Sequence, residues 1–319
     1  MTPPRLLVIG LGAMGRRRVR DGLALGCEVA VWRSHAGAEV GGGAVPAVPA
    51  CVDGPAAAAL WSPTHVAVCT PTSLHLEALA WAVEQRCHVL VEKPLAHDPD
   101  GVEDVLDAAR RAGLCVAVGC NLRFHPGLVA IKAAVDEGRL GRLLSLRAEI
   151  GQYLPDWHST EDYRQSYAAR RALGGGALLT LVHELDLAWW IAGPVTWSTG
   201  LATRVSDLDI DVDDLVELVC RHEGGAVSSI HADFLDRSFN RRSRWVGSEA
   251  TVEWVSGGAT VLHAPEGERV VLWADPGFSL ESTYAAELAD FLAASARGQA
   301  PRTPAADGLG VLRVTRAVA

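Results

Sequence analysis

A glycine-rich segment near the N-terminus constrains the fold of this 319-residue chain more than any other feature. The apolar run at 5–10 (RLLVIG) leads directly into GLGAMG at 10–15, and a helix-like stretch follows. A strand, a Gly-x-Gly-x-x-Gly turn and a helix in this order are typical of dinucleotide-binding domains, because the backbone can then approach a pyrophosphate at the helix N-terminus. The residues predicted to bind the dinucleotide are Gly10, Gly12, Ala13, Met14 and Gly15.

Short apolar runs alternate with helix-like segments as far as residue 121. The runs lie at 5–10, 27–32, 65–70, 88–92 and 114–119. Continuous Val, Leu, Ile and Ala runs are typical of strands buried on both faces of a parallel sheet. Helical spacing at 74–86 and 100–113 completes the alternation. We therefore predict an α/β fold, with a doubly wound parallel Rossmann sheet in residues 1–121. The Ala/Gly/Pro-rich segment 36–59 is expected to be a loop with a short helix.

The remaining residues, 122–319, follow a different pattern. A helix-like segment begins at Pro126, and strand-like runs lie at 142–151, 195–205, 212–222, 225–235, 250–255 and 268–273. Neighbouring strands with few helices between them predict an α+β domain with a large open, mostly antiparallel sheet. One apolar helix is expected at 177–192, after Gly174-Gly175-Gly176, and closing helices are expected at 281–297 and 305–318.

Composition excludes several classes of partner. The formal net charge of −9 disfavours nucleic acid, whose binding surfaces are basic, and no apolar stretch is long enough to span a membrane. The seven cysteines are odd in number and contain no Cys-x-x-Cys pair. We expect reduced thiols in a cytoplasmic protein and no metal site.

The residues at the end of the second predicted strand bear on cofactor choice. NAD-binding proteins usually carry an acid about 20 residues after the glycines, to bind the ribose 2′-hydroxyl. Arg33 and Ser34 stand there instead, and arginine binds a 2′-phosphate through charge-assisted bidentate hydrogen bonds. This favours NADP(H) over NAD(H); a solvated Arg33 is the alternative.

Two residues are candidates for catalysis. Lys93 lies in Glu92-Lys93-Pro94, directly after an apolar run, where a lysine can donate to a substrate oxygen and the proline can set a turn, with a cis bond. His183, in the expected 177–192 helix, can exchange a proton near neutral pH. The alternatives are a surface lysine and a core histidine bonded to backbone. Asp186, one turn beyond His183, can orient its ring or pair elsewhere.

A polar, aromatic stretch precedes the histidine helix. Aromatic and charged groups together suit a sugar, which has an apolar face and a hydroxylated edge. The candidate substrate residues on this stretch are Asp156, Trp157, His158, Tyr163 and Arg164. Further arginines can meet a carboxylate or phosphate, or can be merely solvated: Arg170, Arg171, Arg237, Arg241 and Arg242.

Five stretches in this order resemble the glucose–fructose oxidoreductase / inositol dehydrogenase / MocA (Gfo/Idh/MocA) family over essentially the whole chain. They are GLGAMG, HVAVCTPTSLH (65–75), VEKPL (91–95), GCNLRFHP (119–126) and the GGG…HELD segment (174–186). The resemblance implies a Rossmann domain, then a substrate-binding domain whose open sheet forms a homodimer or homotetramer interface. It implies hydride transfer between NAD(P) and a secondary alcohol or ketone of a sugar, sugar acid or sugar nucleotide.

The resemblance also implies roles for single residues. Lys93 is expected to be catalytic or substrate-orienting, and His183 to be the acid/base. Other cofactor contacts are expected at Thr70, Pro71, Thr72, His75, Glu92 and Lys93, and other substrate contacts at Arg123 and Thr180. Thr180 stands where many members carry aspartate, and the Gly176-to-His183 spacing is shorter, as in a branch associated with surface-sugar and sialic-acid-like biosynthesis. The alternatives are an imine or enamine reductase and a non-catalytic dinucleotide sensor.

Overall fold

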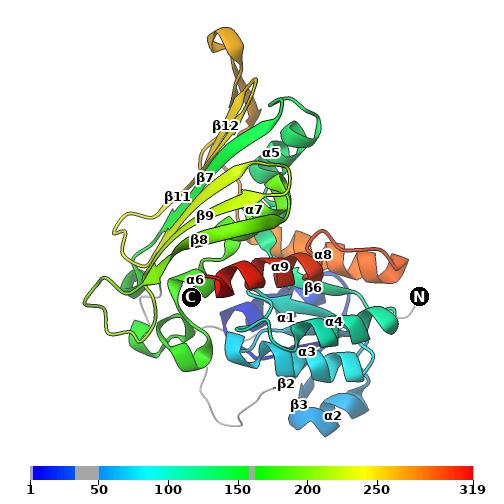
Figure 1. Ribbon diagram of the computed structural model, residues 1–319. Coiled ribbons are helices and arrows are strands. Elements are labelled where there is room, and N and C mark those ends of the chain that lie inside the picture. Colours follow the sequence, from blue (N-terminus) through cyan, green and yellow to red (C-terminus); the bar gives the residue numbers. More distant parts are fainter. Residues whose placement is uncertain (1–2, 33–49, 158–161, 319) are drawn as a thin grey trace. The chain divides into compact units, whose positions relative to one another are not determined.

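The computed structural model describes residues 3–32, 50–157 and 162–318 (Figure 1). Arg33, Ser34 and His158 therefore lie outside the described residues. The chain forms two compact units. The first contains the residues up to Cys120 together with Ala172–Gly174 and Tyr284–Leu312, and the second contains the remainder. Residues 284–312, which the sequence pattern placed in a second domain beginning at 122, thus pack with the first unit.

The first unit is built on a six-stranded parallel sheet, in the order β3-β2-β1-β4-β5-β6. This confirms the predicted doubly wound Rossmann fold. The strand order reverses between β1 and β4, which is where such sheets bind ligands beyond the carboxyl ends of the strands. The strands are β1 (Arg5–Ile9), β2 (Glu28–Trp32), β3 (Ala50–Val52), β4 (His65–Val68), β5 (His88–Glu92) and β6 (Val116–Gly119).

Helices accompany this sheet at the predicted places. They are α1 (Ala13–Ala24), α2 (Gly54–Trp61), α3 (His75–Glu84), α4 (Val102–Arg111), α8 (Glu281–Arg297) and α9 (Ala305–Arg316). Within 36–59, the described part contains β3 and the start of α2, so the expected loop includes a strand.

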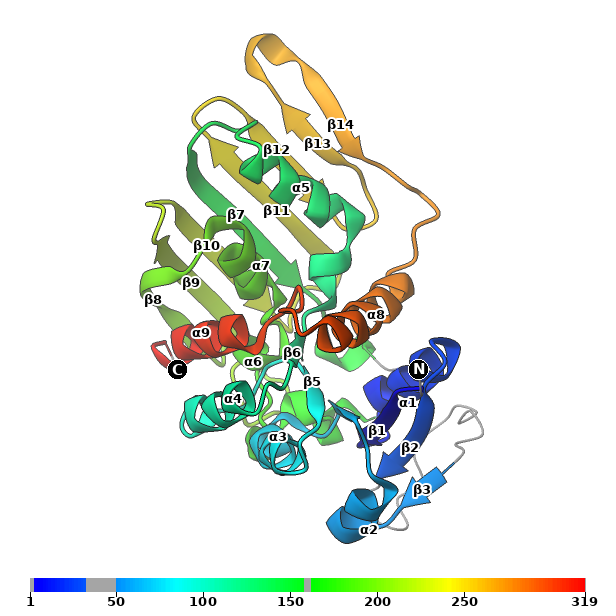
Figure 2. The same cartoon turned by 90° about the vertical axis from the view of Figure 1, so that its right-hand side faces the viewer.

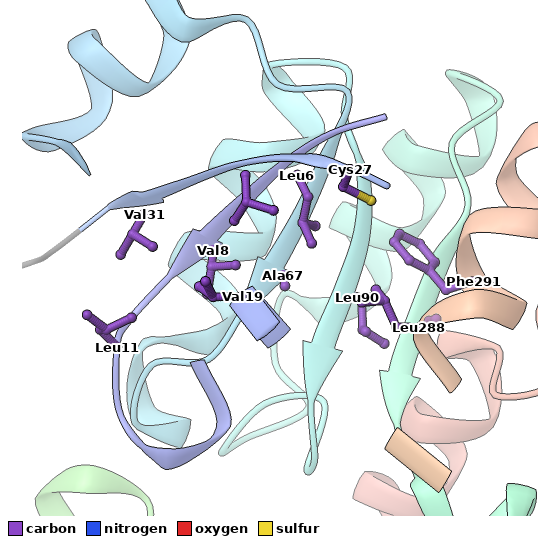
Figure 3. Close-up of a cluster of buried hydrophobic side chains, with 12 residues drawn as sticks. Leu6, Val8, Leu11, Val19, Cys27, Val31, Ala67, Leu90, Leu288 and Phe291 are labelled. Carbon is purple, nitrogen blue, oxygen red and sulfur yellow. The ribbon is translucent and has the colours of Figure 1, made fainter. Parts of the chain in front are cut away.

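The core of the first unit explains why α8 belongs to it. Leu288 and Phe291 of α8 are almost fully buried, in one cluster with Leu6, Val8 and Leu90 of the sheet (Figure 3). Removing these side chains from water stabilises the unit by about 1.5–3 kcal/mol for each large residue. A helix near the C-terminus therefore completes the N-terminal fold.

The second unit contains an eight-stranded sheet, in the order β14-β13-β12-β11-β7-β10-β9-β8. Every neighbouring pair is antiparallel except β7 and β10, which confirms the predicted mostly antiparallel sheet. The strands are β7 (Leu143–Gly151), β8 (Val195–Thr203), β9 (Leu215–His222), β10 (Val227–Asp233), β11 (Asn240–Gly247), β12 (Thr251–Val255), β13 (Thr260–His263) and β14 (Arg269–Trp273). The sequence pattern did not predict β11 and β13.

Helices α5 (Pro126–Asp136) and α7 (His183–Ala192) cover one face of this sheet (Figure 2). The opposite face carries exposed charged and apolar side chains, which alternate with the buried side chains of the helix-covered face. In β9, for example, Glu217, Val219 and Arg221 are exposed, while the residues between them are buried. This alternation is what an antiparallel sheet shows when one face packs on helices and the other does not.

The expected single helix at 177–192 is wrong. The structure has two helices, α6 (Ala177–Thr180) and α7, and Leu181 between them departs from helical angles with φ −99° and ψ 29°. The two helices are anchored to different elements, α6 to the loop before β9 and α7 to β11 and the segment at 121–124. His183 is the first residue of α7 and does not share a continuous helix with Thr180.

Short 3-10 segments connect these elements at Thr72–Leu74, Asn121–Phe124, Leu154–Asp156, Tyr163–Gln165, Tyr167–Ala169, Arg171–Leu173 and Pro265–Gly267. No helix in the described part of the chain is both long and apolar enough to cross a membrane.

Candidate active site

The glycine-rich turn lies between β1 and α1, as predicted. Gly10 has φ +93°, and a Cβ added there would lie 2.7 Å from the carbonyl oxygen of Cys69. A Cβ at Gly15 would lie 2.0 Å from the carbonyl oxygen of Gly10, so neither position accepts a side chain. Gly12 precedes the helix, and a Cβ there would have no neighbour within 4 Å. The N-terminus of α1 therefore has open space beside Gly12 and no side-chain cap, and the N–H groups of a first helical turn carry the partial positive charge that favours phosphate.

The residues after β4 border this turn. Thr70 N lies 3.0 Å from the position of a Gly10 Cβ, and Thr72 is buried in the following 3-10 segment. Thr70 Oγ1 is buried and has no hydrogen-bond partner among the described residues. A buried hydroxyl left without a partner is costly, so it fits a ligand that supplies one. The open space over Gly12 and the Thr70 hydroxyl both fit a dinucleotide.

Lys93 follows β5 directly and is half-buried. The Lys93–Pro94 peptide is cis, as expected. The ring of His75 lies between the ends of two strands, with Nδ1 2.8 Å from the carbonyl oxygen of Pro94 and Nε2 2.9 Å from that of Thr70. Burial lowers the pKa of His75, which is 1% exposed. His75 therefore ties the segment after β5 to the segment after β4.

Glu92, the last residue of β5, takes part in a buried ion cluster that the sequence pattern did not predict. Arg18 of α1 donates from Nε to Glu92 Oε1 at 2.8 Å, from Nη1 to the carbonyl oxygen of Tyr284 at 3.1 Å, and from Nη2 to Glu287. Burial lowers the pKa of Arg18, but the carboxylates of Glu92 and Glu287 more than offset this and raise it overall. The carboxylates of Glu92 and Glu287 are therefore both paired with the guanidinium of Arg18, which stays protonated.

His183 is half-buried at the start of α7, and two residues that follow it on this helix, Glu184 and Asp186, form buried ion pairs. Arg123 donates to both carboxylate oxygens of Asp186, at 3.0 and 2.7 Å. Arg241 of β11 likewise donates to both carboxylate oxygens of Glu184, at 2.7 and 3.1 Å. Of the two alternatives for Asp186, the structure shows pairing with another residue.

Asp213 fixes the start of α6, another contact that the sequence pattern did not indicate beyond the acidic run at 207–214. Its carboxylate accepts from Leu178 N at 2.8 Å, and its carbonyl oxygen accepts from Ala177 N at 3.0 Å. Burial raises the pKa of Asp213. Thr180, at the end of α6, is 3% exposed.

The described residues of the polar stretch lie in or next to the 3-10 segments before α6. Asp156 is exposed, and the Trp157 ring packs edge-on against Phe234 at 5.3 Å. The Tyr163 hydroxyl accepts from Asp209 N at 3.3 Å. Arg164 is exposed and pairs with Asp162. Trp157 and Tyr163 are thus held in place by protein contacts.

The five further arginines each contact a protein group. Arg241 pairs with Glu184 and Arg242 with Glu149, and Arg237 stacks 3.8 Å over the ring of Tyr153. Arg170 donates to the carbonyl oxygen of Arg164, and Arg171 donates to that of Asp211. Among the described residues no group of three or more His, Cys, Asp or Glu side chains is arranged to hold a metal ion.

A parallel sheet in this strand order, with a glycine turn that opens the N-terminus of α1, defines a dinucleotide-binding protein of the Rossmann class. Residues 5–120 match the oxidoreductase family with an NAD-binding Rossmann fold, and residues 128–253 match the GFO/IDH/MocA C-terminal domain. The chain belongs to the Gfo/Idh/MocA family of oxidoreductases, as its motifs indicated.

Relatives by sequence include the levoglucosan dehydrogenase of Pseudarthrobacter phenanthrenivorans, 28% identical over 52% of this chain and 48% of the dehydrogenase. The chain thus matches about half the length of that relative. The rhizopine catabolism protein MocA of Rhizobium meliloti is 27% identical over 79% of this chain and 74% of MocA.

Two solved structures share the fold over nearly the whole chain. An oxidoreductase domain protein from Kribbella flavida has a TM-score of 0.85 at 24% identity, covering 100% of this chain and 96% of that one. A levoglucosan dehydrogenase in complex with NADH also has a TM-score of 0.85, at 21% identity, covering 99% and 96%. At these identities the likeness establishes the fold alone.

Proposed function

We propose that the chain transfers a hydride between the nicotinamide of NAD(P) and a secondary alcohol or ketone carbon of a sugar, sugar acid or sugar nucleotide. The observation that carries this proposal is Lys93, placed by β5 at the carboxyl edge of the same sheet whose β1–α1 turn is open for a dinucleotide. The names of the relatives support the substrate class, because levoglucosan is a sugar derivative. The bound cofactor supplies or accepts the hydride.

In this proposal Lys93 binds and polarises the reacting oxygen, and His183 removes or supplies its proton. The cofactor is held by the glycine turn and by the segments after β4 and β5. Arg123 is buried and forms an ion pair with Asp186 of α7. We therefore propose that Arg123 holds α7, and with it His183, in position. The residues proposed to contact substrate are Asp156, Trp157, His158, Tyr163, Arg164 and Thr180.

The roles of Lys93 and His183 are tested by Lys93→Met and His183→Ala. Each change removes a group proposed to contact the reacting oxygen and leaves the glycine turn intact. We expect kcat to fall by about 10²-fold or more in each variant, while the Kd for the dinucleotide changes less than about twofold in His183→Ala, because His183 is not among the proposed cofactor contacts. Lys132→Met, which removes an α5 lysine paired with Asp136, is the control. Near-wild-type turnover in both variants would refute the assignment. If the wild-type protein bound the dinucleotide but turned over none of a broad panel of polyols and keto-sugars, a non-catalytic sensor would be favoured.

We also propose a preference for NADP(H), which rests on Arg33 and Ser34 in the sequence. The levoglucosan dehydrogenase structure holds NADH, so the proposed preference is based on these two residues of this chain alone. Arg33→Ala is expected to weaken NADPH binding about tenfold and to leave NADH binding unchanged, since only NADPH carries the 2′-phosphate. Fluorescence titration with both nucleotides measures this. Equal affinities in the wild-type protein would contradict the preference.

We further propose a cytoplasmic homodimer or homotetramer that associates through the sheet of the second unit. The sheet face opposite α5 and α7 exposes large apolar side chains, among them Trp197, Leu201 and Val219, next to charged rows. Exposed apolar surface of this kind favours association. Val219→Glu is expected to yield monomers by light scattering, whereas Leu60→Glu, at an exposed position on α2, is expected to leave the mass unchanged. An unchanged mass in Val219→Glu would contradict this interface.

A further inference from the structure

Arg18 is the one buried cation through which the described residues of α1, β5 and α8 are joined. Its side chain is 0% exposed, although arginine is among the residues most rarely buried. Its guanidinium contacts Glu92 at the end of β5, and the Tyr284 carbonyl and Glu287 carboxylate on α8. All these residues belong to the first unit.

Lys93 lies between two residues that are each fixed by a buried side chain. On one side, the carboxylate of Glu92 is held by Arg18. It lies so close to Gly119 of β6 that a Cβ there would be 2.7 Å from Glu92 Oε2. On the other side, the carbonyl oxygen of Pro94 contacts the buried ring of His75. The backbone that carries Lys93 is therefore constrained from both directions.

We infer that Arg18 is a positioning residue for Lys93, and that Glu287 of α8 holds the Arg18 guanidinium in the orientation that grips Glu92. The inference rests on the role proposed for Lys93. Its physical basis is that a group acting on the reacting atoms has to be held within a fraction of an ångström, which the surrounding residues provide. A helix near the C-terminus thereby contributes to the placement of a side chain proposed to act in the N-terminal domain.

Arginine suits this position for a specific reason. Its planar fork serves three acceptors in three directions, whereas the lysine ammonium is a compact point charge on a flexible stem. Arg18→Lys therefore retains the charge between Glu92 and Glu287 but loses the geometry. The matched control is Arg20→Lys on the same helix, because Arg20 is exposed and pairs with Asp21.

The first experiment is a double-mutant cycle on turnover. Arg18→Lys is expected to lower kcat at least about fivefold, with the dinucleotide Kd within about twofold of wild type. In the Lys93→Met background the same change is expected to alter the residual rate less than about twofold, since the group it positions is absent. Equal losses in both backgrounds, or no loss of kcat in folded Arg18→Lys, would overturn the inference. Arg20→Lys is expected to match wild type in each background.

The second experiment does not depend on turnover. Hydrogen exchange of the backbone amides of Lys93, Leu95 and Ala96 is measured in the dinucleotide-free protein. These amides are expected to exchange faster in Arg18→Lys than in Arg20→Lys, while α3 and α4 exchange as in wild type. Identical exchange at the three amides would overturn the inference.

The two experiments separate the inference from the proposed function. If the wild-type protein oxidised no polyol and reduced no ketone, the proposed function would fail and the exchange data would decide the placement of the Lys93 backbone. If Arg18→Lys did not fold, Glu287→Gln would replace it, because it retains Arg18 and Glu92 and changes only the α8 carboxylate. The same faster exchange and the same dependence of kcat on Lys93 are then expected.

Discussion

At the scale of single residues, the buried Asp186 carboxylate is expected to contribute to stability through its ion pair with Arg123. Both of its oxygens accept from Arg123, and the two side chains are 3% and 1% exposed. Removing one partner of a buried ion pair leaves the other charge without compensation. Asp186→Ala is therefore expected to lower the free energy of unfolding by about 3–5 kcal/mol in urea denaturation. Asp136→Ala, which breaks an exposed pair with Lys132, is expected to cost less than about 1 kcal/mol. A similar small loss for both would show that the buried pair contributes little.

Some residues of the candidate site could be predicted from the sequence, and others could not. Gly10, Gly12 and Gly15 were predictable because their spacing is imposed by one local turn, which needs no knowledge of distant residues. The pairing of Arg18 with Glu287 joins residues 269 positions apart, and no local pattern encodes such a contact. A weak signal did exist, because Arg18 falls at helical spacing from Gly15 and Gly22, on the buried face of α1.

At the scale of elements, the start of α6 depends on a glycine. Gly176 has φ +108°, and a Cβ there would lie 2.3 Å from Asp213 Oδ1, the carboxylate that accepts from Leu178 N. Gly176→Ala is therefore expected to cost at least about 1–3 kcal/mol from the backbone alone, and to displace the Asp213 cap. Thermal unfolding measures this. Gly224→Ala is the control, since a Cβ at Gly224 meets nothing within 4 Å and needs no unusual φ. Equal melting temperatures for the two variants would contradict the expectation.

Elements differ in how far their sequence reveals them. The Rossmann strands are continuous apolar runs because both faces are buried, so they are visible in the sequence. Strand β11 reads NRRSRWVG, and its arginines mask a regular alternation in which Ser243 and Trp245 are buried while Arg242 and Arg244 are not fully covered. The break between α6 and α7 is set by tertiary anchors, and the uninterrupted apolar pattern there predicted one helix. Local periodicity therefore identifies elements whose burial is uniform, and fails where a distant contact sets the boundary.

At the scale of the whole molecule, each unit contains a buried histidine whose ionisation opposes folding. Burial, and then the nearby charge of His88, lower the pKa of His65 in the first unit to about 4. Burial, and to a lesser extent Arg241, lower the pKa of His125 in the second unit to about 4. An unfolded histidine titrates near pH 6.5, so between pH 6.5 and about 4 the unfolded chain binds protons that the folded chain does not. The free energy of unfolding therefore decreases as the pH falls through this range.

His231 acts in the opposite direction and limits stability on the alkaline side. Hydrogen bonding to Asp233, and also to Glu217, raises its pKa to about 9 against an opposing effect of burial. Its contribution is fully present below pH 6.5 and is lost as the pH rises through about 9. Together the three histidines predict greatest stability near neutral pH.

The acid side of this profile can be tested at His65, whose ring nitrogens lie 2.8 Å from Thr64 Oγ1 and 2.9 Å from Ser295 Oγ. His65→Asn removes one group that the unfolded chain protonates and the folded chain does not. The slope of unfolding free energy against pH is taken from urea denaturation between pH 6.5 and 4. It is expected to decrease by an amount that corresponds to at most about one bound proton. His97→Asn, the same substitution at an exposed position, is the control, and the decrease in slope in His65→Asn is expected to exceed that in His97→Asn. Because the measurement is a slope, a general loss of stability in His65→Asn does not imitate the effect, and an unaltered slope would show that His65 is protonated in the folded protein as readily as in the unfolded chain.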